Sequence, residues 1–478
     1  MRDTPHIIVI LSDDQGEWAM GCSGNSEIRT PNLDRLAASG IRFTNFFCTS
    51  PVCSPARASL LTGRIPSQHG VHDWIRGGNV GPGAIEYLKG LRGYTDVLHE
   101  RGYDCSISGK WHLGDSRRPQ KGFSHWYVHQ GGGSSYHRAP MVRDGDLVSE
   151  PGYVTEAITD DALSVLAKRA QEADGRPFYL SVHYTAPHSP WLNEHPLDIV
   201  ASYDDCPFSS CPQEPPHPWE LPSTVPASVR VEPREHLKGY FAAVTAMDQQ
   251  IGRILDAVEA YGLRENTLIC FLSDNGYNCG HHGIWGKGNG TFPQNMYDTS
   301  IRVPAIMSHP GRIPAGVVCD ELLSGYDLAP TLLEYAGMEP SALGSRLPGA
   351  SFAHLLEEGG GKGREHVVVY DEYGPVRMIR TKEWKYVHRY PYGPHELYDL
   401  VRDPGERDNL WREAGDADAA RAAQALRMLK AKMEEWFAEH ADPRVDGARE
   451  PVTGKGQIRL AGPAAQGLPA FVQDRQTP

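Results

Sequence analysis

Two acidic motifs stand directly after two similar apolar segments. Residues 6–11 lead into Ser12-Asp13-Asp14, and residues 267–272 lead into Ser273-Asp274-Asn275. Asp13, Asp14, Asp274 and Asn275 offer oxygen donors without a neighbouring set of Cys and His, which suits a hard cation, Ca²⁺ ahead of Mg²⁺. One such pair is often a turn or a helix cap, but the same motif after two similar segments favours a metal site.

Cys53 begins a second candidate site. The segment Cys53-Ser-Pro-Ala-Arg57 continues through good helix formers to Gly63, which predicts a short helix with Cys53 at its N-terminus. A helix N-terminus attracts anions through free backbone N–H groups and the positive end of the dipole. Arg57 follows one turn later on the same side. We therefore expect Cys53 and Arg57 to face an anion, with an ordinary buried cysteine as the alternative.

Four apolar segments are predicted to position these groups. Residues 6–11, 104–108, 178–183 and 267–272 have strand length and alternate with segments of helical period, such as residues 240–258. This pattern is typical of an α/β fold with a large, mainly parallel sheet between helices. Lys110 and His112 follow the second segment, and His188 follows the third. Because ligands bind beyond the carboxyl ends of such strands, these side chains are expected at one rim of the sheet.

The pattern of apolar and polar residues changes after about residue 345. Residues 366–370, 376–380, 384–390 and 396–400 are short alternating segments, which predict a small antiparallel sheet. A following helix is expected to carry Leu426, Leu429, Met433 and Trp436 on one face, and the chain from Asp442 to pack as an extended tail. We therefore predict a catalytic domain over residues 1–345 and a C-terminal subdomain over residues 346–478.

Composition limits the class of partner. The chain has 478 residues, 40% hydrophobic and 22% charged, with a net charge of −13. This indicates a large core, excludes a disordered or fibrous protein, and argues against nucleic acid and other long polyanions as partners. No apolar run is long enough to cross a membrane and the N-terminus does not resemble a signal peptide, so we expect a cytoplasmic protein with no membrane partner.

Two further features are left open by the sequence. Nine cysteines form no zinc-like pattern, and most are expected to be small buried residues, although Cys206 and Cys211 could form a bridge. Residues 202–232 are rich in Pro, Ser and His without periodicity. They are expected to form an exposed excursion that could cover a pocket.

The Cys53 segment resembles the type I sulfatase signature, CxPxR followed by LLTGR. Further segments match in order along nearly the whole chain: SDDQG at 12–16, GKWHLG at 109–114, APHSPW at 186–191, SDNG at 273–276, GIWGKGN at 283–289, RVPAI at 302–306, and ELYDL and DPGERDNL within 396–410. Together they make the sequence similar to the formylglycine-dependent sulfatases of the alkaline phosphatase superfamily. The resemblance implies the alkaline-phosphatase-like α/β sandwich.

The resemblance also implies a role for each matched residue. Asp13, Asp14, Asp274 and Asn275 would bind one Ca²⁺ ion, and Cys53, oxidised to Cα-formylglycine by a separate formylglycine-generating enzyme, would complete the shell. The hydrated aldehyde would attack sulfur, with Asp274 as the local proton acceptor. Arg57, Lys110 and Lys287 would compensate the negative charge on the sulfuryl oxygens. His112 would hold the formylglycine hydroxyl and act as base for sulfate release. His188 with Lys287 would protonate the leaving oxygen.

The function implied is hydrolysis of a sulfate ester to an alcohol and inorganic sulfate. The expected substrate is a sulfated mono- or oligosaccharide or a small aryl or alkyl sulfate. Two alternatives remain: a phosphonate monoester or phosphodiester hydrolase of the same superfamily, and a non-catalytic anion-binding member whose Cys53 is never oxidised. Residues 72–76, 124–130 and 388–395 are aromatic, His-rich candidates for sugar contact. His69, His281 and His282 are either substrate contacts or supporting residues, and the oligomeric state stays open.

Overall fold

The main sheet contains ten strands within the described residues, which are 4–172, 175–221, 227–371, 375–411 and 417–473 of this computed structural model. Its five central strands, β9-β1-β8-β4-β5, are parallel, and the strands at both edges include antiparallel pairs. From edge to edge the strands are β13 (Val317–Cys319), β2 (Ile41–Phe43), β12 (Ala305–Ser308), β9 (Thr267–Ser273), β1 (His6–Ser12), β8 (Phe178–His183), β4 (Asp104–Lys110), β5 (Phe123–His129), β6 (Pro140–Arg143) and β7 (Asp146–Ser149). The predicted mixed, mainly parallel sheet is confirmed.

The centre of the sheet explains the sequence pattern of β1. Its β-branched and leucine residues are buried on both faces, as expected for a parallel strand covered by helices. β1 pairs with β8 on one side and β9 on the other, and Ser12 lies opposite Ser273. The two acidic motifs therefore leave the sheet side by side, because they follow paired residues of adjacent parallel strands.

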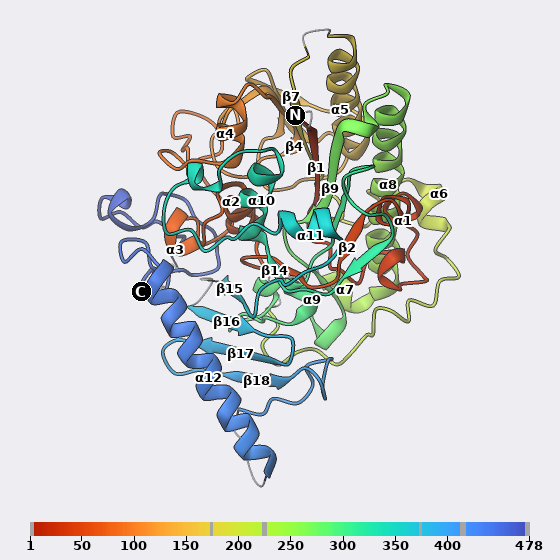
Figure 1. Cartoon of the computed structure of the whole chain (residues 1–478). Helices are drawn as coiled ribbons and strands as arrows, with labels where there is room; N and C mark the ends of the chain where they lie inside the picture. The colour runs from red at the N-terminus through yellow and green to blue at the C-terminus, as the bar shows by residue number, and fades with distance from the viewer. Residues whose placement is uncertain (1–3, 173–174, 222–226, 372–374, 412–416, 474–478) are drawn as a thin grey trace.

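Helices cover the two faces of this sheet (Figure 1). One face packs against α2 (Cys53–Thr62), α4 (Tyr94–Glu100) and α10 (Leu328–Tyr335), and the other against α1 (Pro31–Ala38), α5 (Val154–Gln171) and α8 (Pro233–Ala260). α8 contains the predicted amphipathic segment and buries Tyr240, Val244 and Met247. The shorter elements are β3 (Phe46–Phe47), α3 (Pro66–His69), α6 (Leu197–Ala201), α7 (Ala227–Val231), β10 (Asn278–Cys279), β11 (Trp285–Gly286), α9 (Asp298–Ile301), β14 (Leu323–Ser324) and α11 (Ala353–Glu358).

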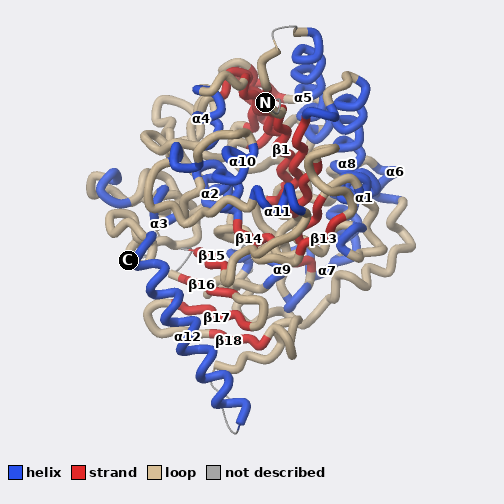
Figure 2. The backbone as a smooth tube through the Cα atoms, in the orientation of Figure 1, coloured by secondary structure: helices blue, strands red, loops and turns tan. Residues whose placement is uncertain are grey.

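A four-stranded antiparallel sheet follows in the C-terminal part of the chain. It consists of β15 (Val367–Asp371), β16 (Val376–Arg380), β17 (Trp384–Arg389) and β18 (Glu396–Asp399), in that order. The long helix α12 (Ala417–His440) packs on it through Leu429, Met433 and Trp436, so the expected sheet and helix are confirmed. Figure 2 shows this sheet separate from the main one. The division at residues 345 and 346 stays a prediction.

The C-terminal tail, residues 442–473, returns to the main body of the protein. Gln457 forms an isolated bridge with Ile75, and its backbone N–H donates to the carbonyl of Trp74. The side chain of Gln457 is fully buried, accepts from the His72 N–H and donates to the Gly70 carbonyl. The expected extended tail is therefore held against residues 70–77 by main-chain and side-chain hydrogen bonds.

The described part of residues 202–232 is mostly exposed or half-buried, as expected, but some of its side chains are anchored in the core. Tyr203, Phe208 and Cys211 are buried in the core on the α8 side of the sheet, and residues 227–231 form α7. The segment is irregular because its aromatic residues, spaced without a period, pack individually onto α8; residues 222–226 lie outside the described part.

Cys206 and Cys211 are both free thiols, so the considered bridge is absent here. Within the described residues, no helix combines the length and apolar character needed to cross a lipid bilayer.

Candidate active site

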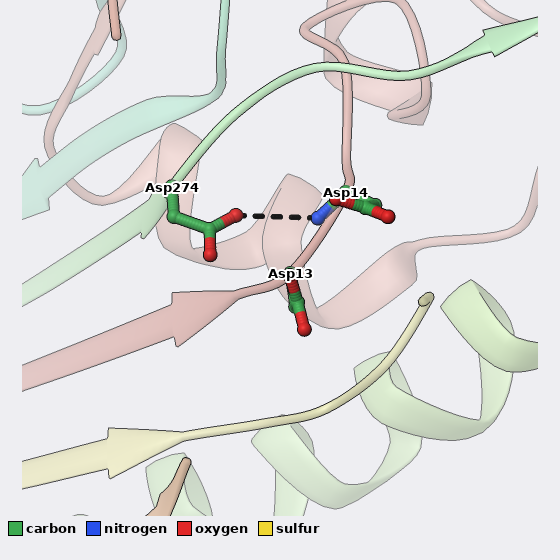
Figure 3. Close-up of side chains that lie close together, drawn as sticks. All are labelled: Asp13, Asp14 and Asp274. Atoms are coloured by element: carbon green, nitrogen blue, oxygen red, sulfur yellow. Dashed lines mark hydrogen bonds between the residues drawn. The ribbon is translucent and has the colours of Figure 1, made fainter. Parts of the chain in front are cut away.

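The carboxyl ends of β1 and β9 bring three carboxylates together (Figure 3). One oxygen from each of Asp13, Asp14 and Asp274 lies within 4.8 Å of the others, and all three side chains are buried. The Asp14 backbone N–H donates to Asp274 Oδ1 at 3.3 Å, and the Asn275 N–H donates to the same oxygen at 2.8 Å. The local backbone fixes Asp274, and Asp14 adopts a positive φ of 66° to reach the cluster.

Each of these carboxylates has its own cationic partner. Lys110, the last residue of β4, pairs with Asp13, and Lys287 pairs with Asp14. Arg57, on α2, donates from Nε to Asp274 Oδ2 at 2.8 Å and from Nη1 to the Lys110 carbonyl at 3.0 Å. The three cations are also buried, so three ion pairs occupy a volume with little water.

The pKa values of the three acids respond differently to this arrangement. Burial alone would raise all three. Lys110 and His188 hold the pKa of Asp13 below its ordinary value, and Lys287 and His188 do the same for Asp14. The pKa of Asp274 is raised, because burial and the neighbouring Asp13 charge outweigh Arg57. Crowded carboxylates of this kind favour a bound cation, which removes their mutual repulsion.

Two buried oxygens in this cluster have no hydrogen-bond donor. They are Asp13 Oδ1 and Asn275 Oδ1, whereas the Asn275 amide nitrogen donates to Asp14 Oδ1 at 2.7 Å. A buried polar atom without a partner is costly, so atoms of this kind are suited to contact a bound ligand. Oxygen donors from Asp13, Asp14, Asp274 and Asn275 therefore fit a hard divalent cation, and among the described residues the group of side chains within ligand distance of one another consists of carboxylates.

Cys53 lies at the first position of α2, as its sequence predicts. The helix ends at Gly63, which has a φ of 67° in the left-handed region that glycine allows. The Cys53 side chain is only 4% exposed, and Lys287 Nζ lies 3.4 Å from its sulfur. Burial raises the pKa of the thiol despite Lys110 and Lys287. An unmodified Cys53 is therefore a poor nucleophile at neutral pH.

Two histidines complete the arrangement. His188 Nε2 lies 3.7 Å from Asp14 Oδ2, and its other ring nitrogen is 2.6 Å from the Ser189 carbonyl oxygen. His112 lies with Nε2 3.0 Å from the Ile75 carbonyl oxygen, and its Nδ1 has no partner. Burial and the Lys110 charge lower the pKa of His112 well below its ordinary value, so its ring is neutral.

These groups open onto a pocket of about 940 Å³. Cys53, Asp14, His112, His188 and Lys287 line it, so the structure brings the predicted residues of both candidate sites to one place. The pocket is also lined by residues that sequence reasoning missed: Asn79, Gly131, Gly132, Gly133, Ser134, Ser135, Gly454 and Lys455. The glycine run before two serines was the only signal for part of this set.

Several other candidates lie away from the pocket. His69 is buried beside Ser59, His281 contacts the Ser210 carbonyl, and the His282 ring stacks on Tyr297 with centroids 3.7 Å apart. They support the local structure, and none of them lines the pocket. Of the three aromatic, His-rich stretches, only residues 72–76 reach it, through Trp74, Ile75 and Arg76.

The sequence profile described as Sulfatase matches residues 5–338, and the profile described as N-sulphoglucosamine sulphohydrolase, C-terminal, matches residues 280–436. The first match alone covers more than half of the chain. The chain belongs to the sulfatase family. It is a sulfuric ester hydrolase, which agrees with the cationic side chain of Lys287 beside Cys53 in the pocket.

Relatives of known activity cover most of this sulfatase. An N-acetylglucosamine-6-O-sulfatase of Bacteroides thetaiotaomicron is 28% identical over 95% of this chain and 90% of its own length. Human arylsulfatase A is 30% identical over 90% of this chain and 88% of its own length. A solved structure of a protein in complex with its substrate D-glucosamine-2-N,6-O-disulfate superimposes with a TM-score of 0.78 at 26% identity, covering 94% of this chain and all of the other. The fold is thus the alkaline-phosphatase-like sulfatase fold.

Proposed function

We propose that this sulfatase hydrolyses a sulfated sugar with a formylglycine made from Cys53 and with one calcium ion. The observation that carries the proposal is the position of Cys53: it starts α2, faces the pocket, and lies beside Lys287 and the carboxylate cluster. Because burial raises the pKa of its thiol, residue 53 needs a chemical change to become an effective nucleophile. An aldehyde that hydrates to two hydroxyls supplies that change.

The carboxylates and the amide hold the proposed cation. Asp13, Asp14, Asp274 and Asn275 contribute the oxygen donors, two of which have no other partner. A bound calcium would supply positive charge that favours the deprotonated form of the hydroxyl of residue 53. With that charge in place, the three lysine and arginine side chains are free to contact the substrate as well as their carboxylates.

The cations and histidines act on the sulfate group. Arg57 is held against Asp274 through Nε, so its guanidinium adds positive charge beside the carboxylate cluster. Lys110 and Lys287 add charge on either side, and each preorganised donor contributes a few kcal/mol, about 2.7 to 4, in the transition state. His188, partly exposed at the pocket, gives a proton to the leaving alcohol oxygen, and neutral His112 takes a proton when sulfate departs.

The substrate class rests on the pocket and on the relatives. A volume of about 940 Å³ accommodates a sugar of one or two rings, and Trp74 offers an aromatic side chain on its wall. The Bacteroides relative is named for a sulfated amino sugar, and the solved structure at 26% identity contains a disulfated one. These observations favour a sulfated mono- or oligosaccharide over a simple alkyl sulfate.

Peptide mass spectrometry across residue 53, combined with an activity assay, tests the nucleophile. Protein produced together with a formylglycine-generating enzyme is expected to carry an aldehyde at residue 53, and the modified fraction should scale with activity. Cys53→Ala, produced in the same way, is the inactive control. Intact cysteine throughout a fully active sample would contradict the proposal.

A comparison of ester types tests the reaction. The protein is expected to turn over a sulfated sugar or an aryl sulfate faster than the matched aryl phosphonate. Dominant turnover of the phosphonate would instead support a phosphonate monoester hydrolase on the same site.

A further inference from the structure

One wall of the catalytic pocket is a loop without apolar side chains. This glycine-serine loop, residues 130–135, follows β5 and has the sequence Gln-Gly-Gly-Gly-Ser-Ser; its residues 131–135 line the pocket. Glycine loses more conformational freedom on folding than any other residue, and this loop has no apolar side chain to bury in return. Its shape therefore depends on hydrogen bonds and on close packing.

The glycine-serine loop packs against both histidines of the site. A Cβ atom on Gly132 would lie 2.3 Å from Cε1 and 2.5 Å from Nε2 of His112, so the Gly132 backbone lies directly against that ring. A Cβ atom on Gly133 would lie 3.4 Å from Cε1 and Nδ1 of His188, which is van der Waals contact. The position of the loop therefore limits where either imidazole can lie.

His129, the last residue of β5, holds the loop with both of its ring nitrogens. Nδ1 lies 3.0 Å from the Gly131 nitrogen and 3.1 Å from the Gly131 carbonyl oxygen, and Nε2 lies 2.9 Å from Ser134 Oγ. In either neutral tautomer, both nitrogens are therefore hydrogen-bonded to the loop. These contacts fix the loop on both sides of Gly132 and Gly133, the two residues that touch the site histidines.

The fold keeps the His129 ring fixed and outside the pocket. His129 lies opposite Lys110 in the register of β5 and β4, its side chain is buried, and it does not line the pocket. Burial lowers the pKa of its ring to about 4, so the ring is neutral near pH 7. The far end of the loop is held by Glu194, which accepts from the Ser135 hydroxyl at 2.8 Å.

We propose that His129 is a positioning residue for the sulfatase reaction: it holds the glycine-serine loop against His112 and His188, so that both rings lie where protons are transferred. The inference rests on the proposed function and adds to it a residue that lies outside the pocket. Without the imidazole of His129 the loop loses its hydrogen bonds at both Gly131 and Ser134, and the two rings are free to turn. A displacement of about 1 Å can lower a rate by about 10²-fold.

Two aryl sulfates that differ in their leaving group test this role in His129→Leu, which removes the hydrogen bonds of the ring. For phenyl sulfate we expect kcat/KM to fall by about 10- to 100-fold, because phenolate leaves poorly without a proton from His188. For 4-nitrophenyl sulfate, whose leaving group needs no such proton, kcat/KM should fall by less than about threefold. A loss of folded protein would lower both values equally. His129→Gln, whose amide nitrogen can reach Ser134, should restore most of the ratio.

His309 provides a matched control. It is fully buried, its ring nitrogens lie 3.1 Å from the Glu265 carbonyl oxygen and 2.9 Å from the Tyr335 hydroxyl, and burial lowers its pKa to about 4. It follows β12, which runs antiparallel to β9, so it lies at the end of the main sheet away from the carboxylates. His309→Leu should lower Tm to a comparable extent and leave the ratio of the two substrates within about twofold of wild type.

Hydrogen–deuterium exchange gives a readout that does not depend on activity. Peptides that cover residues 130–136 should exchange at least about tenfold faster in His129→Leu than in wild type, and His309→Leu should leave them unchanged. Unchanged exchange in this loop, or an equal loss of kcat/KM on the two substrates in His129→Leu, would overturn the inference. The proposed nucleophile fails separately, when fully active protein retains an intact Cys53.

Discussion

Two clusters of buried charge occupy different places in this molecule. The catalytic cluster pairs Asp13, Asp14 and Asp274 one-to-one with Lys110, Lys287 and Arg57. The junction cluster lies between α9 and the antiparallel sheet, where Lys385 contacts both Asp298 and Glu406. Arg380 Nη2 adds a contact to Asp298 at 3.1 Å, and the Asp298 N–H donates to Glu406 at 2.6 Å.

The difference lies in where each cluster opens, because both contain buried polar atoms without a hydrogen-bond partner; in the junction cluster they are Arg380 Nε and Glu406 Oε1. The catalytic cluster contains donor-less oxygens on Asp13 and Asn275 and an acceptor-less nitrogen on Arg57, and it borders a large pocket. The junction cluster contributes no residue to that pocket, and Lys385 is fully buried. A buried ion cluster that borders a large cavity is placed to bind a ligand, whereas one away from the cavity joins two parts of the fold.

Removal of the Cys53 side chain should produce the largest effect, and on activity alone. Cys53→Ala is expected to lower kcat/KM by about 10⁴-fold or more, because the nucleophile is lost. Its free energy of unfolding should change by only about 1 kcal/mol, since the sulfur makes one long contact with Lys287. Steady-state kinetics and denaturant unfolding on the same sample check both values. Residual activity near the wild-type level would contradict the assignment.

Removal of the Lys385 ammonium should lower the stability of the fold and leave activity almost unchanged. Lys385→Met is expected to lower the free energy of unfolding by about 3 to 5 kcal/mol, because Asp298 and Glu406 lose their shared cation. Activity per folded molecule should stay within about twofold of wild type, because the lost charge of Lys385 lies outside the pocket.

Lys382→Met provides the matched control for this variant. Its ammonium pairs with Glu321 at the surface with 44% of the side chain exposed, so the stability cost should be at most about 1 kcal/mol. A similar loss of stability in the two lysine variants would remove the distinction between the junction cluster and ordinary surface pairs.

Calcium should affect only the catalytic cluster. Calcium at a hundred times its Kd should stabilise the chelator-treated protein by about 2.7 kcal/mol, measured as a rise in Tm, and should restore activity. Lys385→Met should keep this increment, whereas Asp13→Asn should lose most of it. Full activity in chelator, with a Tm that does not respond to calcium, would argue against the proposed ion.

A small change in the pocket wall should sharpen the role of His112. A Cβ on Gly132 would lie 2.3 Å from His112 Cε1, so Gly132→Ala must displace the ring; we expect activity to fall by about 10- to 100-fold. A Cβ on Gly131 would meet nothing within 4 Å, so Gly131→Ala is the control and should retain activity. Equal effects in the two variants would indicate a general loss of loop structure.

Much of the catalytic cluster could be predicted because short-range rules place it. Asp13 and Asp274 follow strands whose apolar pattern identifies them as central and parallel, and such strands end at one rim. Cys53 carries the local marks of a helix start. In contrast, Lys455 and Arg76 meet through a contact between segments about 380 residues apart, for which no local pattern exists. From its place in an alternating strand, Lys385 would be expected to face solvent. It is buried because Asp298, on α9, packs against this face of the antiparallel sheet.

The buried position of Cys53 has a consequence for the order of events during synthesis. A modifying enzyme cannot reach a side chain that is 4% exposed at the start of a fully buried helix, so the proposed oxidation must precede completion of the fold. The part of the tail that lines the pocket, Gly454 and Lys455, is made about 400 residues later. At about 5 to 20 residues per second, that separation leaves roughly 20 to 80 seconds for the chemistry. The separation along the chain thus sets the time available to modify residue 53 before the tail completes the pocket.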